Sequence, residues 1–257
     1  MYQKIGDYPR ALENFHKAVF IRKQSLPPNH PDLAASYNNL GIVYRNKGEL
    51  SRALEYTETA LLTGHQSLSP NHPSLAPFYN NAGLIYSDMD DYPKALQYYE
   101  KALLIIQQSL PSNHPDLAAS YNNIGMAYQK MGDYQKALEN FQNALSITQQ
   151  SLPPNHPNLV FSYNNIGIMY RNIGNYEKAL EHLDQACLIV QQSLPVHYPR
   201  LAMCFMNIGS VYCSAYDFEK AYMFCEYGVQ IGEQSLPANH PDLLMYKRNL
   251  AFVEERL

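Results

Sequence analysis

The sequence predicts an all-α protein built as a solenoid of antiparallel helix pairs, and two observations predict it. The first is a period of 42 residues that runs without insertion or deletion through Ser25, Ser67, Ser109, Ser151, Ser193 and Ser235. The second is helical spacing inside each repeat, where apolar and small residues recur at i, i+3, i+4 and i+7. A fixed period of this length is typical of stacked helical repeats that share one continuous core.

Each repeat is expected to contain two helices. In the first full repeat, the first helix should span about residues 32–46, because Pro31 suits a first helical turn and Gly48 permits the left-handed residue that ends it. The second helix should span about residues 49–66. Gly41 lies inside the first helix, where glycine costs about 1 kcal/mol relative to alanine, so we expect two backbones to approach closely there.

Tyrosines recur at two positions of the first helix, on the face that carries this glycine. They are Tyr37, Tyr79, Tyr121 and Tyr163 at one position, and Tyr44, Tyr86, Tyr128 and Tyr170 at the other. Because this face packs against the second helix, we expect these side chains to belong to the core rather than to a binding surface.

The period also predicts the domain organisation, a single array over residues 1–257. It comprises a partial first repeat with only the second helix (1–24), five full repeats (25–66, 67–108, 109–150, 151–192 and 193–234) and a terminal capping helix (235–257). Met1 aligns with Val43, so we expect the chain to begin inside a first helix. In the last helix Lys247 and Glu254 replace aromatic residues of earlier repeats, which is typical of a polar capping face.

Composition excludes several classes of partner. The net charge is −4, so the chain lacks the excess of Lys and Arg by which proteins bind nucleic acid or anionic lipid. No apolar stretch approaches about 18 residues and the N-terminus has no signal-peptide pattern, so we expect a cytoplasmic protein that does not enter membranes. The four cysteines form no C-x-x-C pair and are expected to be free thiols: Cys187, Cys204, Cys213 and Cys225.

The sequence contains none of the common catalytic motifs, so we expect no enzyme, no catalytic residue, no cofactor and no metal site. Histidines occur once per repeat before a helix-opening proline, at His30, His72, His114, His156 and His240. A metal cage needs convergent ligands, and these residues are spaced one repeat apart. Each histidine is therefore expected to contact its own turn.

The repeat resembles a known family. The string Y-N-N-L-G-I-V-Y over residues 37–44, followed by Ala53 and Ala60, is similar to the tetratricopeptide repeat signature, with Tyr37 where that family often has Trp. The 42-residue length, the N-N pair and the N-H-P-D-L-A link at residues 29–34 resemble more narrowly the repeats of kinesin light chains. This resemblance implies a right-handed superhelix and a non-enzymatic scaffold or adaptor, with microtubule-based transport as the associated process.

One asparagine per repeat points away from the seam between the two helices. Asn39 lies about 200° around the helix from Tyr37, and its position recurs at Asn81, Asn123, Asn165 and Asn207, here called the asparagine row, and at Asn249 in the last helix. Each amide could pair with the backbone of an extended peptide, and the resemblance implies such a role in a concave groove. The alternative is a ladder in which each amide bonds the next helix, with Asn38, Asn80, Asn122 and Asn164 as its expected members. Both roles can hold together.

Neighbours of the row suggest the ligand. Apolar pockets are expected from Ile42, Met126 and Ile168, and positive charge from Arg45, Lys130 and Arg171. An acidic peptide with an aromatic or aliphatic anchor would suit these residues, and the kinesin light chain resemblance implies the same class. Pro77 is expected to delay or kink the first helix of its repeat, which counts against Asn81 as a contact.

Three functions remain open from the sequence. The leading hypothesis is an adaptor that binds peptide segments of partner proteins, with a kinesin heavy chain contacted only through regions absent from these residues. The alternative is the recognition arm of a larger enzyme or signalling protein whose functional domain lies upstream of Met1. A structural or self-associating solenoid is the third. The identity of the cargo does not follow from the sequence.

Overall fold

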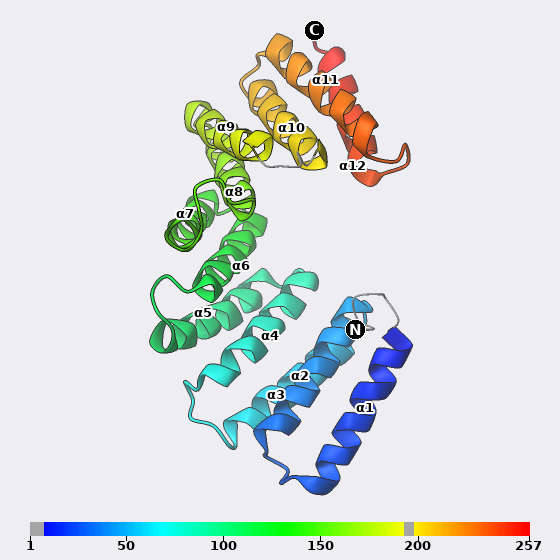
Figure 1. Cartoon of the computed structure of the whole chain (residues 1–257), viewed down its shortest axis with the longest axis vertical. Coiled ribbons are helices and arrows are strands. Elements are labelled where there is room, and N and C mark those ends of the chain that lie inside the picture. The colour runs from blue at the N-terminus through cyan, green and yellow to red at the C-terminus, as the bar shows by residue number, and fades with distance from the viewer. Residues whose placement is uncertain (1–7, 193–197) are drawn as a thin grey trace. The chain divides into compact units, whose positions relative to one another are not determined.

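The computed structural model describes residues 8–192 and 198–257, and every element in this part of the chain is helical (Figure 1). The elements are α1 (Tyr8–Ser25), α2 (Pro31–Asn46), α3 (Leu50–His65), the short 3-10 helix η2 (Pro73–Leu75), α4 (Ala76–Asp88), α5 (Tyr92–Ser109), α6 (Pro115–Met131), α7 (Tyr134–Ser151), α8 (Asn158–Ile173), α9 (Tyr176–Gln192), α10 (Tyr198–Ser214), α11 (Phe218–Ser235) and α12 (Pro241–Glu254). The predictions for Met1 and for the start of a repeat at Ser193 fall outside the described residues.

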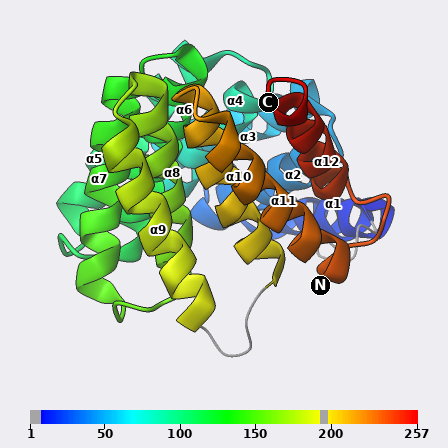
Figure 2. The same cartoon turned by 90° about the horizontal axis from the view of Figure 1, so that it is seen from above.

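Consecutive helices pack as antiparallel pairs, as the period predicts. The chain divides into two compact units, residues 1–131 with α1–α6 and residues 132–257 with α7–α12. In the first unit α2 packs on α3 and α4 on α5; in the second α8 packs on α9 and α10 on α11. Figure 2 shows α10, α11 and α12 following one another within the second unit. The prediction of an all-helical array of pairs is confirmed.

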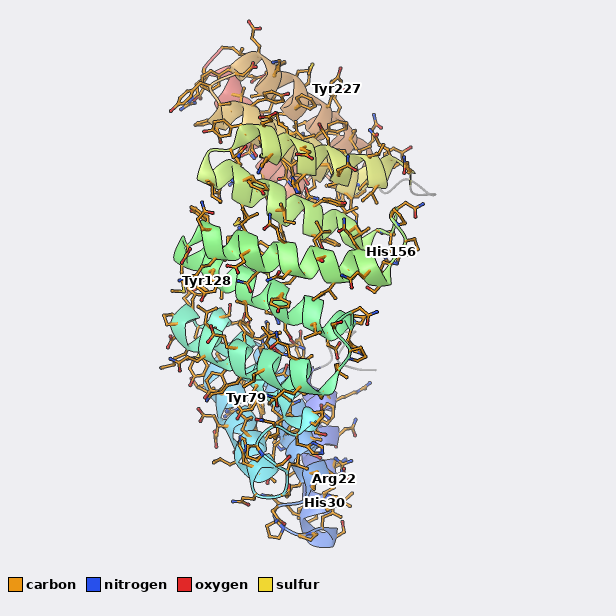
Figure 3. The ribbon with its side chains drawn as sticks, turned by 90° about the vertical axis from the view of Figure 1, so that its left-hand side faces the viewer. Arg22, His30, Tyr79, Tyr128, His156 and Tyr227 are labelled. Carbon is orange, nitrogen blue, oxygen red and sulfur yellow. The ribbon has the colours of Figure 1, made fainter. Side chains whose placement is uncertain are left out.

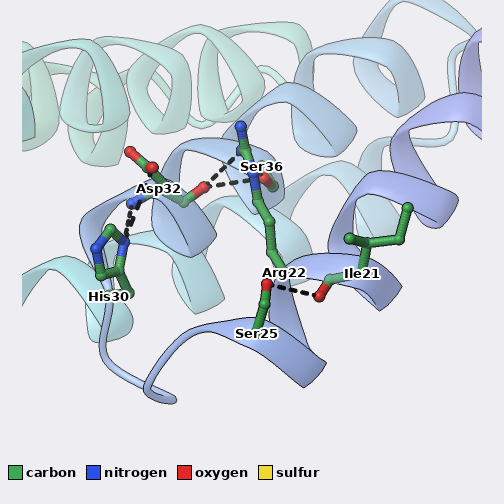
Figure 4. Close-up of polar contacts among 6 residues, drawn as sticks. All are labelled: Ile21, Arg22, Ser25, His30, Asp32 and Ser36. Atoms are coloured by element: carbon green, nitrogen blue, oxygen red, sulfur yellow. Dashed lines mark hydrogen bonds and ion pairs between the residues drawn. The ribbon is translucent and has the colours of Figure 1, made fainter.

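The repeated histidines are helix caps. His30 precedes α2 with extended backbone, and its Nδ1 accepts a hydrogen bond of 3.1 Å from the backbone N–H of Asp32 (Figure 4). Arg22 of α1 holds the same turn, because it donates to the carbonyl oxygen of Asp32 and to the Ser36 hydroxyl. The same histidine cap precedes the other helices of this type, at His72, His114, His156 and His240. The prediction that each histidine contacts its own turn is confirmed.

Pro77 delays its helix, as expected. Helix α4 begins at Ala76, three residues later than α2 in the repeat register, and η2 forms the turn before it. Proline is tolerated in a first helical turn because the backbone N–H that it lacks would have no partner there. Regular α-helix therefore starts where Pro77 occupies the first turn.

Small residues allow the two helices of a repeat to approach. Ala53 and Ala60 on α3 are fully buried. A Cβ added to Gly41 would collide with the Thr57 hydroxyl and lie 3.1 Å from the carbonyl oxygen of Ala53. The close approach predicted at Gly41 is thus present, and it explains a glycine in the middle of a helix.

The tyrosine prediction is correct for only part of the set. Tyr37 and Tyr44 are buried, whereas the other six are only partly buried: Tyr79, Tyr86, Tyr121, Tyr128, Tyr163 and Tyr170, of which Tyr79 and Tyr128 are labelled in Figure 3. Their hydroxyls reach polar groups at the helix edge; the Nε2 of Gln107, for example, donates to the Tyr121 hydroxyl over 3.0 Å. A phenol needs such a partner when its ring packs, so the rings sit at the margin of the core.

Helix α12 has one buried face and one polar face. Leu243, Tyr246 and Val253 are buried against the preceding helices. Lys247 is exposed and forms an ion pair of 2.6 Å with Glu233 of α11. None of the helices in residues 8–192 and 198–257 combines the length and apolar character needed to cross a bilayer.

Candidate peptide-binding site

The asparagine row lies at equivalent places on α2, α4, α6, α8 and α10, and each member is partly buried. Two members form the ladder that the sequence left open. Asn81 Nδ2 donates to Asn38 Oδ1 over 2.9 Å in the first unit, and Asn207 Nδ2 donates to Asn164 Oδ1 over 2.9 Å in the second. These two amides therefore brace adjacent repeats.

The other three members of the row are differently placed. The side chains of Asn39, Asn123 and Asn165 make no hydrogen bond to the described residues of their own compact units. In the first unit, the ladder pattern would pair Asn123 with Asn80, yet Asn80 Oδ1 is buried without a hydrogen-bond partner among the described residues. A buried acceptor without a partner costs about 1–3 kcal/mol, so a new donor to Asn80 Oδ1 would be favourable. We call this missing Asn123–Asn80 bond the unmade rung of the ladder.

A pocket of about 440 Å³ lies beside Asn80, the acceptor side of the unmade rung. It belongs wholly to the first unit and is bordered by η2, α4, the end of α5 and the start of α6. Its lining is mainly apolar with a few polar groups, namely Pro73, Ala76, Pro77, Asn80, Asn81, Ile106, Ser109, Leu110, Asp116 and Ala119. A concave apolar pocket with amides at its edge suits a side-chain anchor next to a hydrogen-bonding backbone.

Arg45 is already neutralised within the first unit. Its Nε lies 2.6 Å from Asp88 Oδ2 and its Nη2 lies 3.3 Å from Asp88 Oδ1, a two-point pairing between consecutive repeats. Sequence reasoning assigned Arg45 to peptide binding without recognising this partner. The remaining predicted neighbours divide by exposure: Ile42 and Ile168 are partly buried, whereas Met126 and Lys130 are exposed.

Arg171 lies in a different environment in the second unit. Its guanidinium donates to Ser210 Oγ over 2.7 Å and to Asn172 Oδ1 over 3.0 and 3.3 Å, all neutral acceptors. Burial lowers the pKa of Arg171, with the Tyr134 phenol and the Cys213 thiol as its titratable neighbours. Desolvation of a cation without a carboxylate partner is unfavourable.

Arg171 also lines a smaller pocket of about 240 Å³, here called the arginine pocket. It is closed by α12, and its lining residues are Arg171, Met206, Gly209, Ser210, Cys213, Ser214, Cys225, Asn249, Phe252 and Val253. Burial raises the pKa of the Cys225 thiol to about 11, so this group stays neutral at pH 7. Arg171 is therefore the charged group of the pocket lining.

Several pocket residues were missed by sequence reasoning. Ile106 lies in α5, the second helix of its repeat, and Leu110 directly follows that helix, whereas the residues predicted for the site all lie on first helices. Asn80 was assigned to the ladder, and its acceptor is unpaired instead. The sequence does contain a signal that distinguishes Arg45 from Arg171: Asp88 is acidic, whereas Ser214, its equivalent three repeats later, is uncharged.

The histidines and cysteines of the described residues do not converge on a metal-ligand cluster. Across residues 8–192 and 198–257, no group of three His, Cys, Asp or Glu side chains could hold a metal ion. The histidine Nδ1 atoms accept hydrogen bonds from their own helix starts, as at His30 and His156, both labelled in Figure 3. All four cysteines are free thiols.

Comparison with known proteins gives a family-level match. The model described as "Tetratricopeptide repeat" matches residues 1–61, 44–108, 74–141 and 116–192. Among curated protein sequences, none matches the chain.

Solved structures with this fold share low sequence identity with the chain. BtubC (BKLC) from P. vanneervenii superposes with a TM-score of 0.73 at 22% identity, over 92% of each chain. A Podospora anserina protein with nearly identical TPR-like repeats of the kinesin light chain type gives 0.72 at 23% identity, over 80% of this chain and 97% of that one. YrrB, described as a TPR protein with an unusual peptide-binding site, gives 0.57 at 23% identity, over 93% and 100%.

Proposed function

Because this chain belongs to the tetratricopeptide repeat family, whose members are in general protein–protein interaction modules, we propose that it is a non-enzymatic adaptor that binds extended peptide segments of partner proteins. The observation that carries the proposal is the unmade rung at Asn123 and Asn80. It leaves the Asn123 amide without a partner in its unit, and it leaves Asn80, whose buried Oδ1 has no partner among the described residues, on the wall of an apolar pocket.

The chemistry of the site supports an extended backbone as ligand. An asparagine side chain offers both a donor and an acceptor, so it can pair with a peptide N–H and C=O whatever side chains the peptide carries. Asn39 and Asn123 supply free amides in the first unit, and Asn165 supplies one in the second. Asn81 and Asn207 donate within the ladder and keep acceptor capacity on Oδ1.

The ligand class is an acidic peptide with an apolar or aromatic anchor. In the first unit, the anchor would occupy the pocket next to Pro77 and Leu110, and an acidic side chain would approach Lys130. In the second unit, Arg171 offers a separate basic contact for an acidic side chain. Neighbours of the kinesin light chain type support a cargo-adaptor role of this kind, with a kinesin heavy chain as a further partner. Groove binding of this sort corresponds to micromolar affinity, about −8 kcal/mol.

The test is a fluorescence-polarisation titration of acidic peptides with a central Trp, Tyr or Leu against wild type and single variants. We expect Asn123→Ala to weaken binding about tenfold, because one buried hydrogen bond to the peptide contributes about 0.5–1.5 kcal/mol. Its melting temperature should not change, since the Asn123 amide has no partner among the described residues of its unit.

Two matched variants complete the design. Asn81→Ala removes a ladder bond and should lower stability by about 1 kcal/mol. Asn143→Ala removes an exposed amide from α7 and should change neither stability nor affinity. A parallel loss of affinity and melting temperature in Asn123→Ala would contradict the proposal and indicate a bracing role. A folded wild type that binds none of the peptides would also contradict it.

A further inference from the structure

The internal repeat supplies its own reference for the arginine pocket. Arg45 and Arg171 occupy equivalent positions three repeats apart, and each contacts a residue of the repeat that follows. Arg45 meets Asp88 there and forms a two-point ion pair with it. The residue equivalent to Asp88 beside Arg171 is Ser214, which carries no charge and donates its hydroxyl to the carbonyl oxygen of Ser210. The carboxylate that neutralises the first arginine is absent at the second.

A second polar group in the same pocket also lacks a hydrogen-bond partner, because a different residue of the repeat has been replaced. Asn249 on α12 continues the asparagine row, and in the ladder it would donate to the residue equivalent to Asn164. That residue is Met206, which cannot accept a comparable hydrogen bond. Asn249 is exposed and makes no hydrogen bond to the described residues of its unit. Arg171 and Asn249 therefore both line the pocket, and each has N–H groups that can donate further hydrogen bonds.

The rest of the lining restricts the shape and charge of an occupant. The lining residues that the structure describes include no acidic side chain. Met206, Phe252 and Val253 supply apolar surface, and Ser210 already accepts from Arg171. The volume of about 240 Å³ is below the roughly 300–1,000 Å³ of pockets that take whole small molecules. One acidic side chain, or the end of one chain, suits this space.

We propose that the arginine pocket is a carboxylate-binding subsite, in which Arg171 and Asn249 hold a carboxylate and Phe252 contacts its aliphatic stem. The carboxylate takes the place that Asp88 occupies beside Arg45. Its source is a partner peptide, either an acidic side chain or a C-terminus, and this part rests on the proposed peptide-binding function. Binding of a simple carboxylate to the pocket does not depend on that function.

The first experiment uses 3-methylbutanoate as the probe and its uncharged amide as the matched control. Binding is followed by the methyl signal of Met206 in ¹³C-methyl-methionine NMR spectra of the full chain, assigned with Met206→Leu. We expect a saturable shift with the acid and a response at least tenfold weaker with the amide, because charge-assisted hydrogen bonds to Arg171 require the carboxylate. Equal responses to acid and amide would overturn the proposal.

The variants are designed from the equivalent repeat. Ser214→Asp places a carboxylate at the position equivalent to Asp88, and it should abolish the response to the probe by pairing with Arg171. Ser214→Asn introduces an uncharged side chain of the same size as Asp, and it should retain the response. Arg171→Gln should abolish the response, and Arg45→Gln, in the other unit, should not. Circular dichroism checks that each variant folds. A probe response that survives both Ser214→Asp and Arg171→Gln would overturn the proposal.

A peptide arm separates this inference from the proposed function. Peptides that bind the wild type are compared with versions in which Glu is replaced by Gln or the C-terminus is amidated. The peptide change that lowers affinity as much as Ser214→Asp does identifies the source of the carboxylate. Response to 3-methylbutanoate without peptide binding would support the pocket and reject peptide binding. Peptide binding that is unchanged in Ser214→Asp and Arg171→Gln would support the adaptor and reject the pocket as its subsite.

Discussion

At the residue scale, backbone conformation explains where the turn glycines occur. The turn between the two helices of a repeat needs a left-handed residue, and Gly48, Gly132 and Gly174 supply it with φ between 80° and 86°. Two repeats use other residues at this place, Asp90 at φ 61° and Tyr216 at φ 60°. A left-handed conformation costs an L-residue about 1–2 kcal/mol, so these turns are held by the helices on either side.

Tyr216→Gly should therefore stabilise the protein by about 1 kcal/mol and raise its melting temperature. Tyr216 is 81% exposed, and its ring meets the Phe218 ring edge to face, so little packing is lost. Thermal unfolding monitored by circular dichroism measures the change. Gly174→Ala is the reverse control and should destabilise the protein. An unchanged or lower melting temperature in Tyr216→Gly would show that the tyrosine ring stabilises the turn.

At the element scale, acidic caps begin several of the second helices. Asp133 caps α7: its Oδ1 accepts from the backbone N–H of Lys136 over 3.2 Å, and its Oδ2 lies 3.1 Å from Lys136 Nζ. These contacts lower the pKa of the Asp133 carboxyl, with the backbone hydrogen bond as the largest cause. Asp91 and Asp217 repeat the arrangement, whereas Asn175 provides the same cap without charge.

The lowered pKa of Asp133 predicts a pH dependence of stability. Because the unfolded state binds the proton more readily, the stabilisation is complete above the unfolded pKa, about 4, and is lost as pH falls through the folded value. Asp133→Asn keeps the cap and removes the titration, so its melting temperature should fall less than that of wild type between pH 6 and pH 3. Asn175→Asp should fall more. Parallel curves for all three proteins would contradict the assignment.

At the scale of the whole molecule, a repeat in a stacked array packs chiefly on its neighbours, so we expect damage to one repeat to stay local. Leu243 is buried on α12 and lies close to Gly232 of α11. Leu243→Ala should cost about 2–5 kcal/mol through a cavity. We expect faster amide hydrogen exchange in α10–α12, with protection of α2–α5 unchanged.

The control for this prediction lies on the same helix. Leu244 is 42% exposed, so Leu244→Ala should leave hydrogen exchange close to that of the wild type. Faster exchange in α2–α5 of Leu243→Ala would show that the array unfolds as one cooperative body instead of repeat by repeat.

Much of the architecture could be read from the sequence because it depends on local rules. The 42-residue period predicted the helix pairs, and the boundaries at Pro31 and Gly48 follow from the conformations that proline and glycine permit. The one-per-repeat histidines could be assigned to helix starts for the same reason. The tyrosines were only partly predictable, because periodicity identifies the packing face and not how far a ring extends to the edge of the core.

Which amides and arginines of the candidate site are already paired within the protein could be learned only from the tertiary structure. Asn81 and Asn123 are equivalent in sequence, yet Asn81 donates to Asn38 while Asn80 Oδ1 has no partner among the described residues. Arg45 and Arg171 are equivalent too, and they differ because Asp88 faces one and Ser214 lies near the other, 43 residues further along the chain. A hydrogen bond forms or fails with small changes in distance and angle between adjacent helices, and this geometry exists only once the repeats have packed.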